Sequence, residues 1–191
     1  MKKKALTQIA FEFASIVFAV LLALGLSTYK NSIDLENESL NVRQNIIKEF
    51  KTNLQKIDSV LIKNVIYTNY LDSMVRLQPE EVNSFYFDYE FELLTHSAWD
   101  IAQNNNSTNL IETQFLLDAA DIYHMQNFLE GFAGKVFENI GMALMRANEL
   151  QDFNMALSMY YNVDLMNNVS QSLKDSYEDF LTKYDTSNSE D

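Results

Sequence analysis

The sequence predicts an all-α protein: one N-terminal transmembrane helix that continues into, or is followed by, a long helix, and then an antiparallel bundle of about four to five helices. Only four glycines and one proline occur among 191 residues, whereas sandwiches and barrels need many turn residues. Hydrophobic residues make up 47% of the chain, which is enough for the core of one domain. Over most of the chain they recur at the spacing of amphipathic helices.

The first element is a predicted membrane-spanning helix over residues 7–29. Its centre, FASIVFAVLLALGL at 13–26, contains no charge, and the whole segment is long enough to cross a bilayer core of about 30 Å. Three lysines lie in residues 1–6, which we expect to be a cytoplasmic tail because basic flanks stay inside. Tyr29 and Lys30 suit the opposite interface. The predicted location is a bacterial inner membrane, with the main domain in the periplasm.

Two other interpretations of this segment are open. The basic start, the apolar middle and the small-residue sequence Ala23-Leu24-Gly25 also fit a cleaved signal peptide. Thr7, Gln8 and Glu12 favour a retained anchor, because they make the first turns polar and lengthen the helix. A buried core helix is the third interpretation.

Within the anchor, one carboxylate and several small residues are candidate contacts with another helix. A carboxylate inside a membrane usually faces a partner or water. Glu12 also lies about one turn from the cytoplasmic surface, so it is within reach of the head groups. Small side chains let two helices approach closely. The candidate contact residues are Glu12, Ala14, Ser15, Ala19 and Ala23.

Residues 30–184 form the predicted exported helical domain, and 185–191 a disordered tail. A long helix begins between Ile33 and Leu40 and ends near Leu77, and it forms one rod with the anchor if nothing interrupts the two. One of its faces steps by three or four residues and is the candidate helix-packing or interface surface. Its members are Ile46, Phe50, Leu54, Ile57, Leu61 and Val65.

Residues 84–94 have a different pattern, with apolar side chains at every second position, the period of a strand. No partner strand is visible elsewhere, so helix or irregular structure is favoured. Further helices are predicted over 96–102, over 110–150 as one or two helices, and up to Tyr184. Gly131, Gly134 and Gly141 are expected to permit close helix contact or to mark a bend.

Two blocks of the sequence resemble a known group of proteins. The first, FEFASIVFAVLLALGLSTYKNS, combines Glu12 with a run that ends in Ala23-Leu24-Gly25-Leu26. The second is Ser97-Ala98-Trp99-Asp100-Ile101-Ala102, followed by Leu110, Tyr123 and Gln126. Both are similar to single-pass bacterial membrane proteins of unknown function, common in Bacteroidetes-type genomes. Those proteins often place a tryptophan where this chain has Tyr29. The resemblance implies one membrane span and an exported helical domain, but it implies no catalytic activity. It also marks Trp99, Tyr123 and Gln126 as family-pattern residues.

Composition and motifs exclude most chemistry. The chain has no cysteine, so disulfides, thiolate metal sites, a cysteine nucleophile and a lipoprotein anchor are excluded. There is neither a glycine-rich phosphate loop nor a G-x-S-x-G elbow. Asp118, Asp121 and His124 share one predicted helix, but a di-iron bundle needs two such motifs and extra glutamates. His96 and Asp100 are spaced to pair on a helix surface. We therefore expect no enzyme activity, no cofactor and no metal.

The formal net charge of −13 favours a soluble acidic domain that repels nucleic acid and anionic head groups. The function predicted from these features is a structural or interaction subunit of a bacterial envelope complex, associating through its anchor and its acidic helical domain. Its expected partner is a second copy or another envelope protein. The alternative is an extracytoplasmic ligand-binding or sensory module acting through a partner, although no sequence feature identifies a small-molecule ligand.

Overall fold

The computed structural model describes residues 2–77, 86–145 and 152–185. The helices are α1 (Lys2–Val75), α2 (Ser97–Gln103), the 3-10 helix η2 (Asn106–Leu110), α3 (Thr113–Met145) and α4 (Asp152–Tyr184). None of the described residues belongs to a strand, so the predicted all-α class is confirmed. Most of the tail predicted at 185–191 lies outside the described residues.

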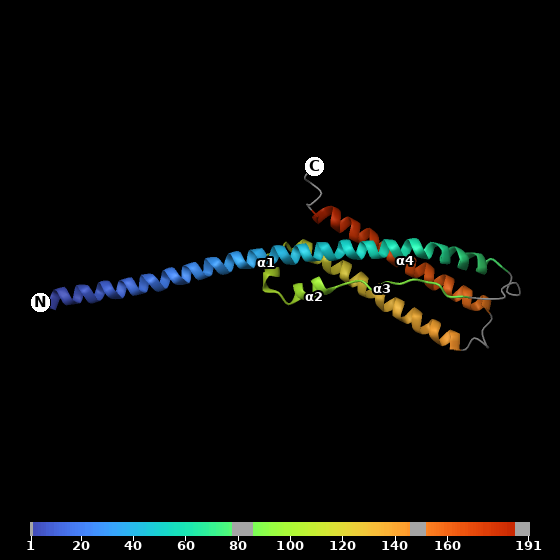
Figure 1. The fold of residues 1–191 in the computed structure, drawn as a ribbon, viewed down its shortest axis with the longest axis horizontal. Helices are drawn as coiled ribbons and strands as arrows, with labels where there is room; N and C mark the ends of the chain where they lie inside the picture. Colours follow the sequence, from blue (N-terminus) through green and yellow to red (C-terminus); the bar gives the residue numbers. More distant parts are fainter. Residues whose placement is uncertain (1, 78–85, 146–151, 186–191) are drawn as a thin grey trace.

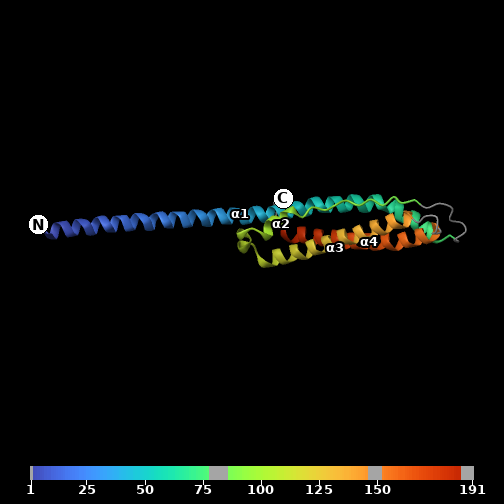
Figure 2. The same cartoon turned by 90° about the horizontal axis from the view of Figure 1, so that it is seen from below.

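Helix α1 is a single uninterrupted helix of 74 residues. At 1.5 Å per residue it is about 110 Å long. Its N-terminal part projects alone from the molecule, and its C-terminal part is a full member of the bundle (Figures 1 and 2). Of the two predicted alternatives, the apolar segment therefore continues directly into the long helix. Residues 2–6, expected to be a tail, are already helical.

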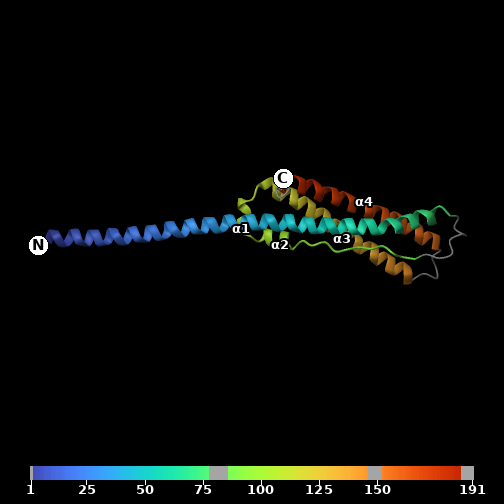
Figure 3. The same cartoon turned by 45° about the horizontal axis from the view of Figure 1, so that its top comes forward.

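The bundle is built from α1, α4 and α3, with α4 packed against both of the others and antiparallel to each (Figures 1 and 3). Residues 86–96, here named the strap, have no helix or strand and run back along α1 toward α2. Phe87 and Phe91 of the strap both contact the ring of Phe137 on α3, at centroid distances of 6.0 Å. The strap therefore fills the space between α1 and α3 that a further helix would take in a four-helix bundle.

The sequence favours helix or irregular structure for 84–94, and the described part, 86–94, is irregular; 84 and 85 lie outside the described residues. The strand-like alternation is also meaningful, because Phe87, Tyr89 and Phe91 all turn toward the core. It ends at Leu93, whose side chain is 71% exposed. The segment is therefore extended but has no partner strand. Such a segment can pack in a helical bundle only if other groups form hydrogen bonds with its backbone N–H and carbonyl groups.

The core has two main clusters along the bundle. In the one nearer the projecting part of α1, the ring of Phe50 contacts Tyr123, Tyr177 and Phe180 at centroid distances of 4.9, 5.0 and 4.8 Å. The other cluster, farther along, is centred on Tyr67 and includes Tyr89 of the strap. Burying an aromatic side chain of this size stabilises a fold by about 1.5–3 kcal/mol, so these rings contribute much of the hydrophobic stabilisation of the bundle.

The predicted face of α1 is in part the core face. Ile46, Phe50 and Ile57 are buried, and Leu54 and Leu61 pack against the same cluster. Val65 is 55% exposed and does not belong to the core. Steps of four residues drift by about 40° each around a helix, so the buried line passes instead to Asn64 and Tyr67.

The glycines of α3 have neither of the roles predicted for them within this chain. Gly131, Gly134 and Gly141 all lie inside one continuous helix. A Cβ atom built on any of them meets no other atom within 4 Å. The positions are open, so no close helix contact in the described structure requires glycine there.

Candidate membrane anchor and interaction surfaces

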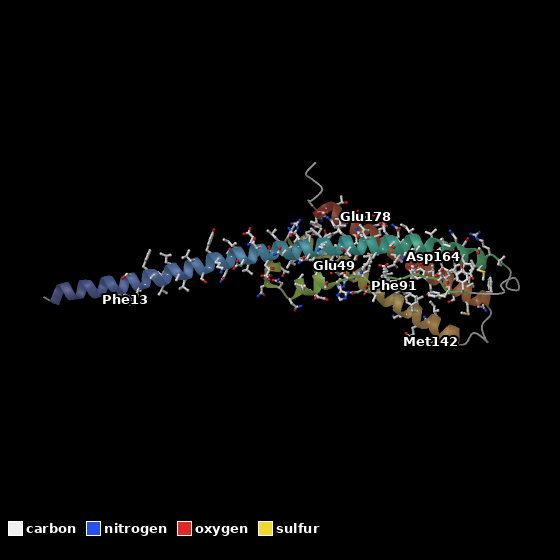
Figure 4. The ribbon with its side chains drawn as sticks, in the orientation of Figure 1. Phe13, Glu49, Phe91, Met142, Asp164 and Glu178 are labelled. Atoms are coloured by element: carbon white, nitrogen blue, oxygen red, sulfur yellow. The ribbon has the colours of Figure 1, made fainter. Side chains whose placement is uncertain are left out.

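Residues 15–26 of the projecting part of α1 carry no charge and expose apolar side chains on every side. All described side chains from Phe13 to Glu38 are exposed, and Phe13, at 68% exposure, lies far from every other element (Figure 4). A helix that is hydrophobic all round is normally buried in protein or in a membrane. By length and composition, the described residues contain one helix suited to crossing a membrane, and the apolar stretch is near its N-terminus.

Of the candidate contact residues in the anchor, Ser15, Ala19 and Ala23 are exposed. Their spacing of four places them along one side of α1. Glu12 and Ala14 lie in the same helix, but their side chains are outside the description. The structure therefore supports a shared face for three of the five residues.

A short acidic stalk separates the anchor from the bundle. It spans residues 30–38, carries Asp34, Glu36 and Glu38, and ends where Ser39 becomes the first buried side chain. Nine helical residues correspond to about 14 Å. Glu38 accepts a hydrogen bond from Nδ2 of Asn105 at 2.9 Å, which ties the end of the stalk to the base of the bundle.

Two asparagines of α1 hold the strap by its backbone. Oδ1 of Asn64 accepts from the Glu90 N–H at 2.9 Å, and its Nδ2 donates to the Glu90 carbonyl at 2.8 Å. Asn53 makes the same pair of bonds with Thr95, at 2.9 and 2.7 Å. Both asparagine side chains are buried, so each replaces the hydrogen bonds that a neighbouring strand would supply.

The spacing of the two asparagines matches the strap. From residue 53 to residue 64, α1 rises about 16 Å, and five extended residues from 90 to 95 also span about 16 Å. A helix and an antiparallel extended chain therefore come into register at these two positions. Lys56 adds a third contact between them, donating from Nζ to the Leu93 carbonyl at 2.8 Å.

A buried polar cluster lies where the strap meets α3 and α4. Gln126 of α3 donates from Nε2 to the Thr95 carbonyl at 3.2 Å. Its Oε1 accepts from the hydroxyl of Tyr177 at 2.9 Å and from Nδ2 of Asn53 at 3.4 Å. Burial raises the pKa of Tyr177, so this hydroxyl keeps its proton and remains a donor. Three helices and the strap are joined by these bonds.

Glu49 of α1 caps the short helix α2. Its Oε2 accepts from the Ser97 hydroxyl at 3.0 Å and from the Ala98 N–H at 3.1 Å. The N-cap residue of α2, His96, provides no capping hydrogen bond from its own side chain. A carboxylate at a helix N-terminus satisfies free N–H groups and suits the helix dipole. A buried residue 48 positions earlier in the chain thus stabilises the start of α2.

The same carboxylate also binds one of the three family-pattern residues. Oε1 of Glu49 accepts from the hydroxyl of Tyr123, whose pKa is raised by burial and by this negative partner. The ring of Trp99 stacks on that of Tyr123 at 5.1 Å, and Gln126 follows one turn later on α3. The structure brings Trp99, Tyr123 and Gln126 together as packing and strap-holding residues.

Sequence reasoning missed Glu49, Asn53 and Asn64. Their position in the sequence could have indicated that they are buried, because they fall on the helical line that joins Ile46, Phe50, Ile57 and Tyr67. Polar residues on a core line require buried partners. What those partners are depends on segments far away in the sequence.

The remaining predicted constellations are surface pairs. Nδ1 of His96 lies 2.8 Å from Oδ2 of Asp100, as predicted, and this hydrogen bond raises the pKa of the imidazole. Asp118 accepts from Lys183 at 2.8 Å, and this bond, together with those from Tyr184 and Gln114, lowers its pKa to about 2. The described residues contain no group of three metal-binding side chains.

The chain matches no protein-family model, no curated protein and no solved structure in the comparisons made. The resemblance to single-pass bacterial membrane proteins stays a prediction. Function therefore has to be inferred from the anchor and from the surfaces of the bundle.

Proposed function

We propose that the protein is a membrane-anchored structural or interaction subunit of a bacterial envelope complex. In this proposal residues 7–29 span the inner membrane, the N-terminus is cytoplasmic and the acidic bundle is periplasmic. The observation that carries it is a helix with apolar side chains exposed on all sides that continues without a break into the core of a folded domain.

Lipid is the environment that best suits the anchor. Each large apolar side chain left in water costs about 1.5–3 kcal/mol relative to its burial. A single partner groove would cover only one side of such a helix, whereas a bilayer covers all of it. The basic residues before the span and the acidic bundle after it agree with the proposed orientation.

Association would begin in the membrane. Ser15, Ala19 and Ala23 provide a small-residue face for close helix approach, and Glu12 provides a polar group that favours a partner. Because α1 runs from the anchor into the bundle, two associated anchors would fix the distance between the domains that they carry. A rigid connection of this kind suits a structural subunit.

The decisive experiment is intact-mass and native mass spectrometry of the full-length protein, C-terminally tagged and extracted in a mild detergent. The expected result is an uncleaved chain, either as a defined homo-oligomer or with a stoichiometric protein partner. A chain cut near Ala23-Leu24-Gly25 would instead identify a signal peptide. Such a cut would leave the bundle intact, because the first buried residue is Ser39. An uncleaved monomer without a partner would contradict the interaction role.

Two matched pairs of variants sharpen the test. Leu22→Glu places a charge in the centre of the span, at a cost of about 2.5–3.5 kcal/mol for insertion, and should release protein from membranes washed at alkaline pH. Ile62→Glu adds the same charge to the exposed surface of the bundle and should leave the protein in the membrane. Glu12→Leu should weaken recovery of the partner, whereas Glu36→Leu in the stalk should not. Unchanged recovery with Glu12→Leu would remove Glu12 from the mechanism.

A further inference from the structure

An open groove of about 470 Å³ runs along α1 beside the C-terminal end of α4. It begins just above the stalk. The side chains that line it come from α1, from the last residue of α4 and from the residue after it: Leu40, Arg43, Gln44, Ile47, Lys48, Lys51, Tyr184 and Asp185. We propose that this groove binds an anionic amphiphile, a molecule with one carboxylate or phosphate head and an apolar chain. The inference concerns the bundle and does not depend on the anchor.

The charge of the groove is opposite to that of the molecule. Its lining contains three basic residues and one acidic residue, in a chain with a formal charge of −13. A groove of about 430 Å³ farther along α1 and α4 is lined by no charged residue. A local positive excess on an acidic domain attracts anions to that position and leaves the rest of the surface repulsive.

Two of the three cations are held in place by the protein. Nη2 of Arg43 donates to the Tyr184 carbonyl at 3.3 Å, and the guanidinium lies 5.1 Å from the centre of the Phe115 ring. Lys51 forms an ion pair with Asp185. A guanidinium has five N–H donors, so Arg43 keeps donors for a ligand while its position is fixed.

Lys48 is the cation best placed to receive a new anion. It is exposed, and among the described residues its ammonium group takes part in no hydrogen bond or ion pair. It lies one turn from both Gln44 and Lys51 on the groove side of α1. An anionic head bound by Lys48 would therefore lie beside the spare N–H donors of Arg43.

The apolar part of the lining specifies the rest of the ligand. Leu40 is 52% exposed, and Ile47 and the ring of Tyr184 line the same groove. Leu40 and Lys48 are separated by about 12 Å along the helix, with Ile47 between them. A ligand with its head at Lys48 and its chain over Ile47 and Leu40 would satisfy the charge and cover the exposed apolar surface. A small inorganic anion would leave that surface in water.

The test uses the full-length protein in nanodiscs of zwitterionic lipid, with octyl phosphate as the probe below its micelle concentration. Octyl phosphate should raise the thermal unfolding midpoint, while inorganic phosphate and octyltrimethylammonium should not. Lys48→Glu should weaken octyl phosphate binding about tenfold or more, because it removes a charge-assisted contact and adds repulsion. Lys135→Glu, the matched change on the exposed side of α3, should bind like the original protein.

Equal stabilisation by inorganic phosphate would overturn the proposal by showing a simple anion site, and equal stabilisation by octyltrimethylammonium would overturn it by showing apolar partition. Equal binding by Lys48→Glu and the original protein would also overturn it. Leu40→Asn should weaken octyl phosphate but leave the fold unchanged, because Leu40 is not part of the core. Nanodiscs with anionic lipid distinguish the source: stabilisation without added probe, lost in Lys48→Glu, identifies a membrane lipid, and its absence identifies a free amphiphile.

Discussion

Asn64 of α1 and Glu90 of the strap are joined by two hydrogen bonds, so that one side-chain amide satisfies both backbone groups of one residue. Asn53 and Thr95 repeat this arrangement three helical turns away. These two asparagine contacts explain how an extended segment packs into a bundle whose other long elements are helices. The strap needs no partner strand because α1 supplies equivalent groups at matching intervals.

Removing one of these amides should loosen the strap. Asn64→Ala leaves the partly buried N–H and carbonyl of Glu90 without these partners, and we expect the free energy of unfolding to fall by about 1–3 kcal/mol. Urea unfolding measures the loss, and hydrogen exchange should increase over residues 86–96. Asn69→Ala, at an exposed position five residues later on α1, is the control and should change stability by less than about 0.5 kcal/mol. Equal effects from the two variants would contradict the role of Asn64.

Both side-chain oxygens of Glu49 should be needed as acceptors. Glu49→Gln keeps the shape, but in either orientation its amide nitrogen faces donors from which it cannot accept, either Tyr123 or Ser97 and Ala98. We expect a loss of about 1–3 kcal/mol. The emission of Trp99, the only tryptophan, should report the change because this ring stacks on Tyr123. Glu112→Gln, at an exposed position, is the control. An unchanged Trp99 spectrum in Glu49→Gln would mean that α2 is held without this cap.

The glycines of α3 should be replaceable with a gain in stability. Gly131→Ala and Gly134→Ala add a methyl group in open space within a helix, and each should stabilise the fold by about 0.5–1 kcal/mol. Thermal unfolding of the single variants and of the double variant measures the gain. A loss of stability that appears only in an assembled complex would place these positions at an interface with a partner.

The orientation in the membrane can be tested by labelling, because the chain has no cysteine to remove. Asn109→Cys, in the exposed part of η2, should react with a membrane-impermeant maleimide once the outer membrane is opened. Lys3→Cys should react only after the inner membrane is broken. The opposite order would reverse the proposed topology.

The ion pair between Asp118 and Lys183 should make stability sensitive to acid. The folded protein lowers the pKa of Asp118 from 3.8 to about 2, so the unfolded chain binds the proton more readily. Its contribution is fully present above pH 3.8 and is lost as the pH falls toward about 2. Asp118→Asn should therefore unfold with a flatter pH dependence over that window. Both groups are close to solvent, so high salt should reduce the difference.

The sequence by itself determined the helical class, the apolar segment, the long helix after it, and most of the core face of α1. These properties depend on composition and on periodicity within a few turns, which local physics decides. Even the alternation in the strap was readable, as an extended pattern without a partner strand.

Tertiary structure decided the rest. Val65 is exposed because the buried line drifts around α1 and follows the neighbours that it meets. Glu49, Asn53 and Asn64 acquire their roles from groups 26 to 74 residues away. A polar side chain at a core position of a helix indicates that it needs a hydrogen-bond partner. Only the packing of distant segments determines which partner it has, because hydrogen bonds require contact in space and not in sequence.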